Sequence, residues 1–166
     1  MLQLADPRID PNKPKNTGVT PFSIACENGH KEVVSLLLAD PKIDPNKPRN
    51  DQGTPLWFAS QNGHVVIVQH LLASEREIDT KMKSAYNNKT AAERARAMGA
   101  RATKPADETE EVFQRSKTNG PLCADLIDAY EKDPAKVRSQ LRMQLGLPGN
   151  PSPFFFLFWE IMFAIF

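Results

Sequence analysis

The sequence contains one segment twice. Residues 5–38 read ADPRIDPNKPKNTGVTPFSIACENGHKEVVSLLL, and residues 39–72 read ADPKIDPNKPRNDQGTPLWFASQNGHVVIVQHLL. The two segments are identical at 19 of their 34 aligned positions. A fixed period of about twenty to fifty residues is typical of proteins in which small units stack side by side. We therefore interpret the two segments as one structural unit used twice.

Helix start and stop signals divide each unit in the same way. Thr20-Pro21 and Thr54-Pro55 place a capping side chain before a proline at the first helical position, where its missing N–H costs nothing. Asn28-Gly29 and Asn62-Gly63 follow within about two turns and favour a left-handed helix stop. Each unit is therefore predicted to begin with a loop, which is followed by a short helix that ends in a tight turn.

A second, longer helix is predicted after each turn. It opens at His30 in the first unit and at His64 in the second. Apolar residues then recur at the spacing of a helix face, namely Val34, Leu37 and Leu38, and again Val68, Leu71 and Leu72. The IDPNKP stretches between the helical pairs predict a turn or an extended loop, because proline and asparagine favour neither helix nor central strand.

This pattern resembles the ankyrin repeat, which runs TPLHxAAxxGH before a second, apolar helix. Matching residues are Thr20-Pro21-Phe22, Ala25 and Gly29-His30, then Thr54-Pro55-Leu56, Ala59 and Gly63-His64, with Asp10-Pro11-Asn12 and Asp44-Pro45-Asn46 in the finger loops. The sequence departs from the pattern where Ser23 and Trp57 replace the histidine, and its period is one residue longer than the usual one. In the second unit the glycine of the finger turn is shifted to Gly53.

The resemblance implies an all-α fold, an ankyrin-like solenoid of helix-turn-helix repeats with loop or hairpin fingers that ends in irregular capping helices. Residues 1–4 match the last turn of a long helix and are interpreted as the end of a truncated repeat. Complete repeats are expected at 5–38 and 39–72, and the start of a degenerate one at 73–99, with a short helix from about Thr90 to Met98. The ankyrin-like part of the chain is therefore residues 1–99.

Residues 100–147 are expected to form a polar insertion followed by capping helices. The acidic stretch before Val112 can begin an exposed helix, and an apolar helix is predicted to start anew at Gly120-Pro121. We interpret that second helix as the long helix of the degenerate repeat. A final helix is expected to start at Asp133-Pro134 and to end before Gly146.

Residues 148–166 form an apolar, phenylalanine-rich tail. From Phe154 to Phe166 only Glu160 is polar, and a helix of that length reaches roughly 20 Å, which is shorter than a bilayer core of about 30 Å. The tail can be a buried closing helix, the cut end of a longer or shifted reading frame, or an anchor to a membrane or a partner. If the tail is an anchor, it could bring the protein into contact with a membrane.

Composition and motifs give no support to catalysis or to cofactor binding. The formal net charge of +1 offers no general attraction for nucleic acid, and the sequence lacks HExxH, CxxC, GxGxxG and GxxxxGK motifs. We therefore expect no enzyme activity, no cofactor, no metal, no nucleic acid and no small-molecule substrate. Cys26 and Cys123 are widely separated in the sequence and are interpreted as reduced thiols of the core, which favours an intracellular, cytoplasmic protein. The first ten residues show neither the basic start nor the apolar run of a signal peptide.

The resemblance implies a non-catalytic scaffold or adaptor that binds an unidentified protein partner on a concave surface. In ankyrin-like proteins this surface consists of the fingers and the exposed side of the short helices. The corresponding residues here are Lys13, Lys15, Asn16, Val19 and Glu27, then Lys47, Arg49, Asn50, Gln52, Trp57 and Gln61. Trp57 can instead pack between fingers. Two further alternatives are a membrane-tethered adaptor and a fragment of a larger multidomain protein whose activity lies outside this chain.

Overall fold

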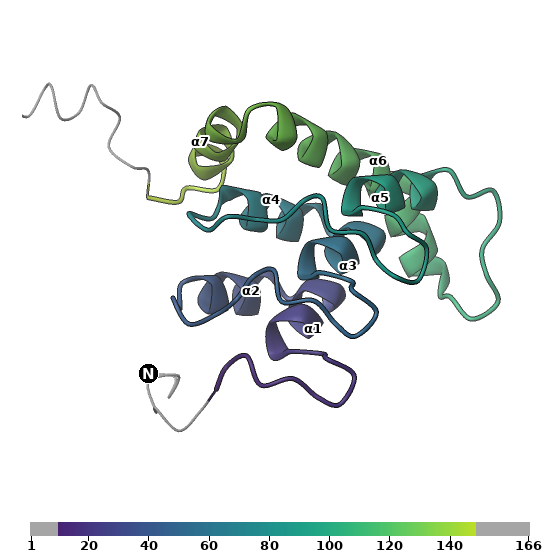
Figure 1. Ribbon diagram of the computed structural model, residues 1–166. Helices are drawn as coiled ribbons and strands as arrows, with labels where there is room; N and C mark the ends of the chain where they lie inside the picture. The colour runs from purple at the N-terminus through teal and green to yellow at the C-terminus, as the bar shows by residue number, and fades with distance from the viewer. Residues whose placement is uncertain (1–9, 149–166) are drawn as a thin grey trace, which may run out of the picture.

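A computed structural model describes residues 10–148 of the chain. In this part the fold consists of helices and loops without strands. The helices are α1 (Pro21–Asn28), α2 (Lys31–Leu38), α3 (Pro55–Gln61), α4 (Val65–Ala73), α5 (Ala91–Gly99), α6 (Glu110–Lys132) and α7 (Pro134–Gln144). Figure 1 shows the helix pairs stacked one above another, each preceded by a long loop. The all-α ankyrin-like solenoid is confirmed.

The predicted helix signals act as expected. The side chains of Thr20, Thr54 and Thr90 each accept a hydrogen bond from the backbone N–H three residues later, at the starts of α1, α3 and α5. Gly29 and Gly63 adopt left-handed φ angles of 77° and 69° in the turns that follow α1 and α3. Helices α2 and α4 begin directly after His30 and His64, although neither histidine side chain caps its helix.

Asparagine side chains connect the loops of successive repeats. The Asn12 amide donates to the carbonyl oxygen of Lys42 and accepts from the backbone N–H of Asp44 at 2.9 Å. Asn46 repeats this arrangement one unit later, with Glu77 at 2.7 Å and Asp79 at 2.9 Å. Each asparagine amide thus hydrogen-bonds to one carbonyl oxygen and one N–H of a loop, where no helix or strand provides partners for the backbone. These hydrogen bonds thus hold neighbouring loops in the same arrangement at both junctions.

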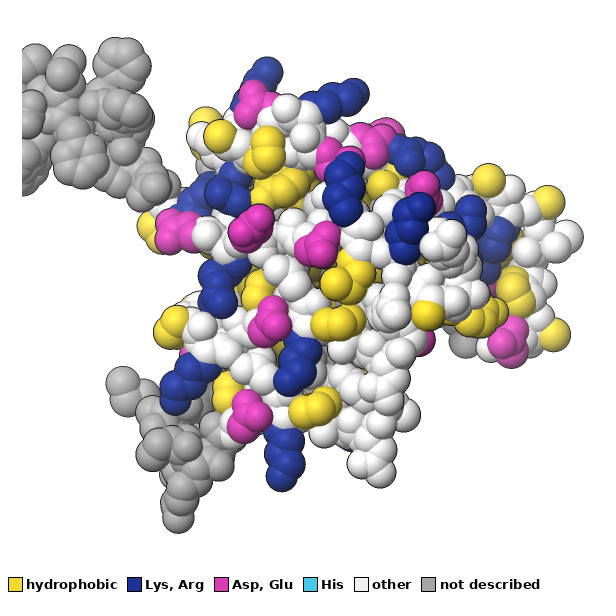
Figure 2. All heavy atoms as spheres, in the orientation of Figure 1, with side chains coloured by type: hydrophobic (Ala, Val, Ile, Leu, Met, Phe, Trp, Pro, Cys, Tyr) yellow, Lys and Arg dark blue, Asp and Glu magenta, His cyan; other side chains and the backbone are white. Residues whose placement is uncertain are grey.

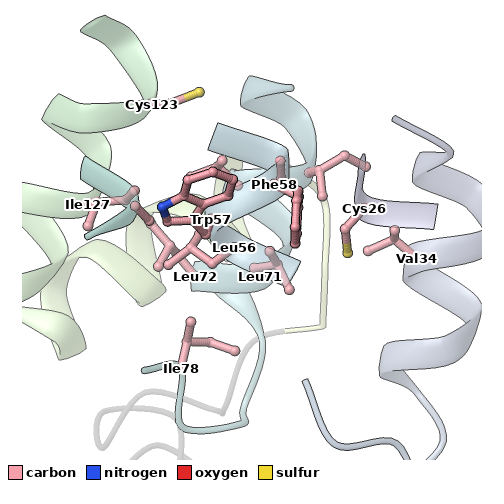
Figure 3. Close-up of a cluster of buried hydrophobic side chains, with 14 of the residues drawn as sticks. Cys26, Val34, Leu56, Trp57, Phe58, Leu71, Leu72, Ile78, Cys123 and Ile127 are labelled. Atoms are coloured by element: carbon pink, nitrogen blue, oxygen red, sulfur yellow. The ribbon is translucent and has the colours of Figure 1, made fainter. Parts of the chain in front are cut away.

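The core runs continuously between the repeats. Figure 3 shows Cys26 and Val34 of the first unit near Phe58 and Leu71 of the second, with Ile127 of α6 on the other side of α3 and α4. Leu71 and Leu72 are fully buried, as the apolar spacing of the long helices predicts. Burial of a leucine contributes about 1.5–3 kcal/mol, so the contacts between repeats supply most of the stability of such short helices.

The prediction that a new helix starts at Gly120-Pro121 is wrong. Helix α6 runs without interruption from Glu110 to Lys132 and contains Pro121 in its interior. A β-carbon on Gly120 would lie 2.4 Å from the carbonyl oxygen of Ala95, and the Pro121 ring lies against Gly99. The absence of a side chain at Gly120 thus lets α6 cross α5 in close contact, and this packing outweighs the local preference of glycine and proline to end a helix.

The finger turn of the second repeat also differs from the sequence interpretation. Gly18 has a φ of 78° in the first finger, and Gln52 occupies the equivalent position in the second finger with a φ of 61°. The turn is therefore unshifted, and a glutamine adopts the left-handed conformation. Gly53 serves another purpose, because a β-carbon there would lie 2.6 Å from the Phe58 ring.

Candidate partner-binding surface

The tips of the three fingers are connected to one another by backbone hydrogen bonds. The N–H of Asn50 donates to the carbonyl oxygen of Thr17 at 3.2 Å, and the N–H of Ala85 donates to that of Asp51 at 2.8 Å. The first two tips are closed by N–H to C=O bonds from Lys15 to Val19 and from Arg49 to Gly53. Side chains on different tips therefore lie at fixed positions along one edge of the stack, where the fingers project as loops in Figure 1.

The predicted partner-binding residues other than Trp57 fall into two groups. Five of them, all on the fingers, are exposed, namely Lys13, Lys15, Asn16, Asn50 and Gln52. Another five are only partly exposed, namely Val19, Glu27, Lys47, Arg49 and Gln61. The structure thus brings the first group together on the fingers and places the second group closer to the helices.

The partly exposed group includes residues that hold the repeats together. The Arg49 guanidinium forms an ion pair with Glu27 of the preceding repeat and lies 3.7 Å from the centre of the Phe58 ring. Lys47 Nζ donates to the carbonyl oxygen of Asn12 at 3.2 Å. Arg49 and Lys47 thus contribute to packing between repeats. A partner that binds these side chains would compete with these contacts.

Gln61 and Trp57 belong to the interface between the second and third repeats. The Gln61 side-chain oxygen accepts a hydrogen bond from Arg94 Nε at 2.9 Å. Trp57 is only 3% exposed, and its indole N–H donates to the carbonyl oxygen of Lys89 at 3.1 Å. The Trp57 ring also packs edge-on against Phe58, with ring centres 5.0 Å apart. The assignment of Trp57 to the exposed binding surface is therefore wrong, and the alternative of packing between fingers describes it correctly.

Tyr86 is the aromatic residue that the sequence interpretation missed. It lies at the tip of the third finger with 79% of its surface exposed. The turn is closed by a bond from the N–H of Ser84 to the carbonyl oxygen of Lys89, and the Ser84 hydroxyl accepts from the Tyr86 N–H at 3.2 Å. The signal in the sequence is a lengthened finger, KMKSAYNNK, with one aromatic residue among polar ones. Tyrosine is enriched among the residues that dominate binding energy at protein interfaces.

The finger tips carry both signs of charge, with an excess of lysine. Lys13, Lys15 and Lys83 are exposed, and Asp51 is the exposed acid at the second tip. Over the face drawn in Figure 2, basic and acidic side chains are interspersed without a large patch of one sign. The exposed lysines of the fingers can therefore attract the acidic segment of a partner.

Both cysteines and His64 show the features of structural side chains. Both thiols are buried, and burial raises the pKa of Cys123 to about 12 and that of Cys26 still higher, so the reactive thiolate is scarce at neutral pH. Burial lowers the pKa of His64, whose Nε2 lies 2.9 Å from the carbonyl oxygen of Glu27 in the preceding repeat. Within residues 10–148, no three potential ligand side chains gather closely enough to hold a metal ion.

The predictions for the chain ends concern residues outside the described range. The truncated repeat at residues 1–4 and the phenylalanine-rich segment from 154 to 166 both lie there. Among the helices between residues 10 and 148, none is long and apolar enough to cross a bilayer. The proposal of a membrane tether therefore remains a prediction from the sequence.

Comparison with known families agrees with the geometry. The family model for ankyrin repeats (three copies) matches residues 1–84, which is half of the chain. The match covers both complete units and the beginning of the third finger. A search of the curated proteins finds no match. From its capped short helices, its left-handed turns, its stacked fingers and this match, the chain belongs to the ankyrin repeat family.

Proposed function

We propose that this chain is a non-catalytic, intracellular protein-binding module whose partner contacts the three finger tips. Ankyrin repeats are in general protein–protein interaction modules and typically form scaffolds without enzymatic activity. The observation that carries the proposal is the exposure of Tyr86 on a tip that hydrogen bonds hold in line with the other two. A large aromatic side chain on a rigid support loses little conformational entropy on binding.

The revised binding surface consists of exposed residues from all three fingers. It comprises Lys13, Lys15 and Asn16 of the first finger, Asn50 and Gln52 of the second, and Lys83 and Tyr86 of the third. The three lysines favour a partner with an acidic segment beside an apolar pocket or face that receives the Tyr86 ring. Charged residues at the rim of such an interface mainly affect association rate, whereas the aromatic residue affects dissociation.

The test compares proteins recovered from cells with the wild-type chain and with a Tyr86→Ser variant. Met143→Ser is the matched control, because Met143 is 78% exposed on α7, away from the fingers. We expect Tyr86→Ser to weaken the affinity for a recovered partner at least about thirtyfold, the range of an interface hot spot, and Met143→Ser to leave it unchanged. Both variants should keep the wild-type helical circular dichroism.

The lysines provide an independent measurement on the same partner. Lys15→Glu should slow association, and its effect should shrink as the salt concentration rises, because exposed charges are screened. A partner whose affinity is unaffected by both Tyr86→Ser and Lys15→Glu would contradict the proposed surface. Loss of binding through Met143→Ser would instead place the partner on α7.

A further inference from the structure

Two of the three histidines in the chain lie where the second repeat meets the first. They are His64 and His70, and both are half-buried. The first contacts Glu27 of α1, and the second contacts Ser35 of α2. Histidine is the side chain whose charge ordinarily changes between about pH 5 and pH 8. The junction between these two repeats therefore contains two groups that mild acid can charge.

The His64 ring packs against the backbone of the first repeat. Its Nε2 lies 2.9 Å from the carbonyl oxygen of Glu27, and the Asn62 amide donates to the same oxygen at 2.8 Å. A carbonyl oxygen only accepts, so Nε2 carries the proton of the neutral ring and Nδ1 is the nitrogen that acid protonates. A β-carbon on Gly29 would lie 2.6 Å from that Nδ1. The added proton would therefore lie against the turn between α1 and α2.

The charged groups around His64 favour its neutral form. Arg115 of α6 donates to a carbonyl oxygen of the same turn at 2.9 Å, and His30 approaches from the first repeat. The Glu27 carboxylate of α1 is already paired with Arg49. Burial lowers the pKa of His64, the charge of Arg115 lowers it further, and the hydrogen bond to the Glu27 carbonyl raises it only in part. The closed junction thus holds the neutral ring.

His70 has a similar environment on the other side of α4. Its Nδ1 lies 3.3 Å from the Ser35 hydroxyl in α2. Burial lowers the pKa of His70, and Lys31 of α2 lowers it further, whereas Glu32 of α2 raises it. Three further charged side chains line the groove beside His70, namely Glu75, Arg76 and Arg142. Their net charge is positive, so the neutral ring is the favoured form here as well.

The first repeat shows what happens to a histidine without this cover. His30 is the equivalent of His64 by the 34-residue period, and its side chain is exposed. Figure 1 shows α1 and α2 at one end of the stack, with α3 and α4 on one side of them. Movement of this single helix pair away from its neighbour would return the rings of His64 and His70 to water, where a charged ring is readily solvated.

We propose that the junction between the first and second repeats is an acid-sensitive joint, at which α1 and α2 separate from α3 and α4 when His64 and His70 are protonated. The open joint binds these protons more readily than the closed one, so protonation and opening favour each other. Stability of the joint is complete above about pH 6.5, where a histidine in water is neutral, and falls as the pH drops below this value. Most carboxylates stay charged down to about pH 5, so the histidines dominate this range.

Native-state hydrogen exchange of the full chain at about pH 7.5 and about pH 5.5 tests the joint. Each exchange rate is divided by the intrinsic rate at the same pH, which gives an opening constant. We expect the opening constants of α1 and α2 to rise at least about threefold in acid and to stay larger than those of α5 and α6. Unchanged constants in α1 and α2 would overturn the proposal. Equal constants in all four helices would also overturn it, because acid would then unfold the stack as a whole.

The double variant His64→Gln with His70→Gln removes both titrating groups, and the glutamine amide can still donate to the Glu27 carbonyl. Its opening constants for α1 and α2 should be the same at both pH values. His30→Gln is the matched control, because it removes the equivalent but exposed histidine, and it should keep the acid response of the wild type. An acid response that persists in the double variant would overturn the proposal, since other groups would then be responsible.

The ring protons of the wild type provide a measurement that requires no variant, should the double variant fail to fold. In nuclear magnetic resonance spectra the rings of His64 and His70 should titrate at a lower pH than the same rings in the urea-unfolded chain. Titration of both rings at the value of the unfolded chain would contradict the proposal, because the closed joint would then bind protons as readily as the open one.

Discussion

At the scale of single residues, Gln52 shows that a repeat sequence can change without a change in its backbone. The first finger uses Gly18 at the left-handed position, and the second uses Gln52 in nearly the same conformation. A side chain in this region of φ and ψ costs about 1 kcal/mol or more. The closing hydrogen bond, from the N–H of Gln52 to the carbonyl oxygen of Arg49 at 2.9 Å, compensates for part of this cost.

Gln52→Gly should therefore stabilise the protein. We expect the free energy of unfolding to rise by about 0.5–1 kcal/mol, because the left-handed strain is removed at an exposed position. Urea denaturation followed by circular dichroism measures this change. Gln52→Ala keeps the β-carbon and serves as the control, which should stay within about 0.5 kcal/mol of the wild type. A glycine variant no more stable than the alanine variant would show that the left-handed conformation at position 52 carries no strain.

The contrast between Trp57 and Tyr86 shows what the sequence could predict about the surface. The exposure of Lys13, Lys15, Asn16 and Asn50 could be predicted, because the resemblance assigns them to the fingers. The burial of Trp57 depends on contacts with Lys89 and Arg94, which belong to the next repeat, where the repeat pattern has weakened. Tyr86 was missed for the same reason, since the lengthened third finger has no counterpart in the first two.

At the scale of elements, capping residues and prolines in the sequence predict where most of the helices begin. The starts of α1, α3, α5 and α7 follow from a capping side chain, and in three of these helices from the proline after it. Helix α6 could not be predicted in this way, because its continuity past Gly120 and Pro121 depends on α5, which is more than twenty residues away in the chain. The continuity of α6 thus depends on contacts between residues that are distant in the sequence.

Gly120→Ala tests this explanation of α6. Alanine is the better helix former by about 1 kcal/mol, so a purely local view expects stabilisation. We expect destabilisation by about 1–3 kcal/mol instead, because the new methyl group would lie 2.4 Å from the Ala95 carbonyl oxygen and force α5 and α6 apart. Thermal and urea denaturation measure the difference.

The control for Gly120→Ala is Thr118→Ala, at an exposed position of the same helix. This variant should be as stable as the wild type or slightly more so, since only helix propensity changes. Equal stabilisation by the two substitutions would show that α6 is not held against α5 at Gly120.

At the scale of the whole molecule, the stack is asymmetric. Helices α3 and α4 have packed neighbours on both sides, whereas α1 and α2 have one on a single side within the described chain. In a repeat protein, stability is approximately the sum of the terms for single repeats and for their interfaces. The first repeat of the monomer therefore lacks one interface term and should open before the others.

Native-state hydrogen exchange at low protein concentration should reveal this order. We expect the slowest amides of α1 and α2 to exchange with an opening free energy at least about 1 kcal/mol below that of the slowest amides of α3 and α4. Uniform protection across these four helices would mean that the described repeats unfold only together.

The asparagine connections between fingers have a consequence for the history of the sequence. Because Asn12 and Asn46 make the same two contacts with the loop that follows, the junction after the first unit is equivalent to the junction after the second. An in-frame tandem duplication of one unit would therefore create a junction that is already compatible with its neighbours. The third finger has Lys81 at this position, where it pairs with Glu131 instead. Duplication of a unit can thus lengthen this array between its first two units, whereas the third unit, which lacks the asparagine, offers no equivalent junction.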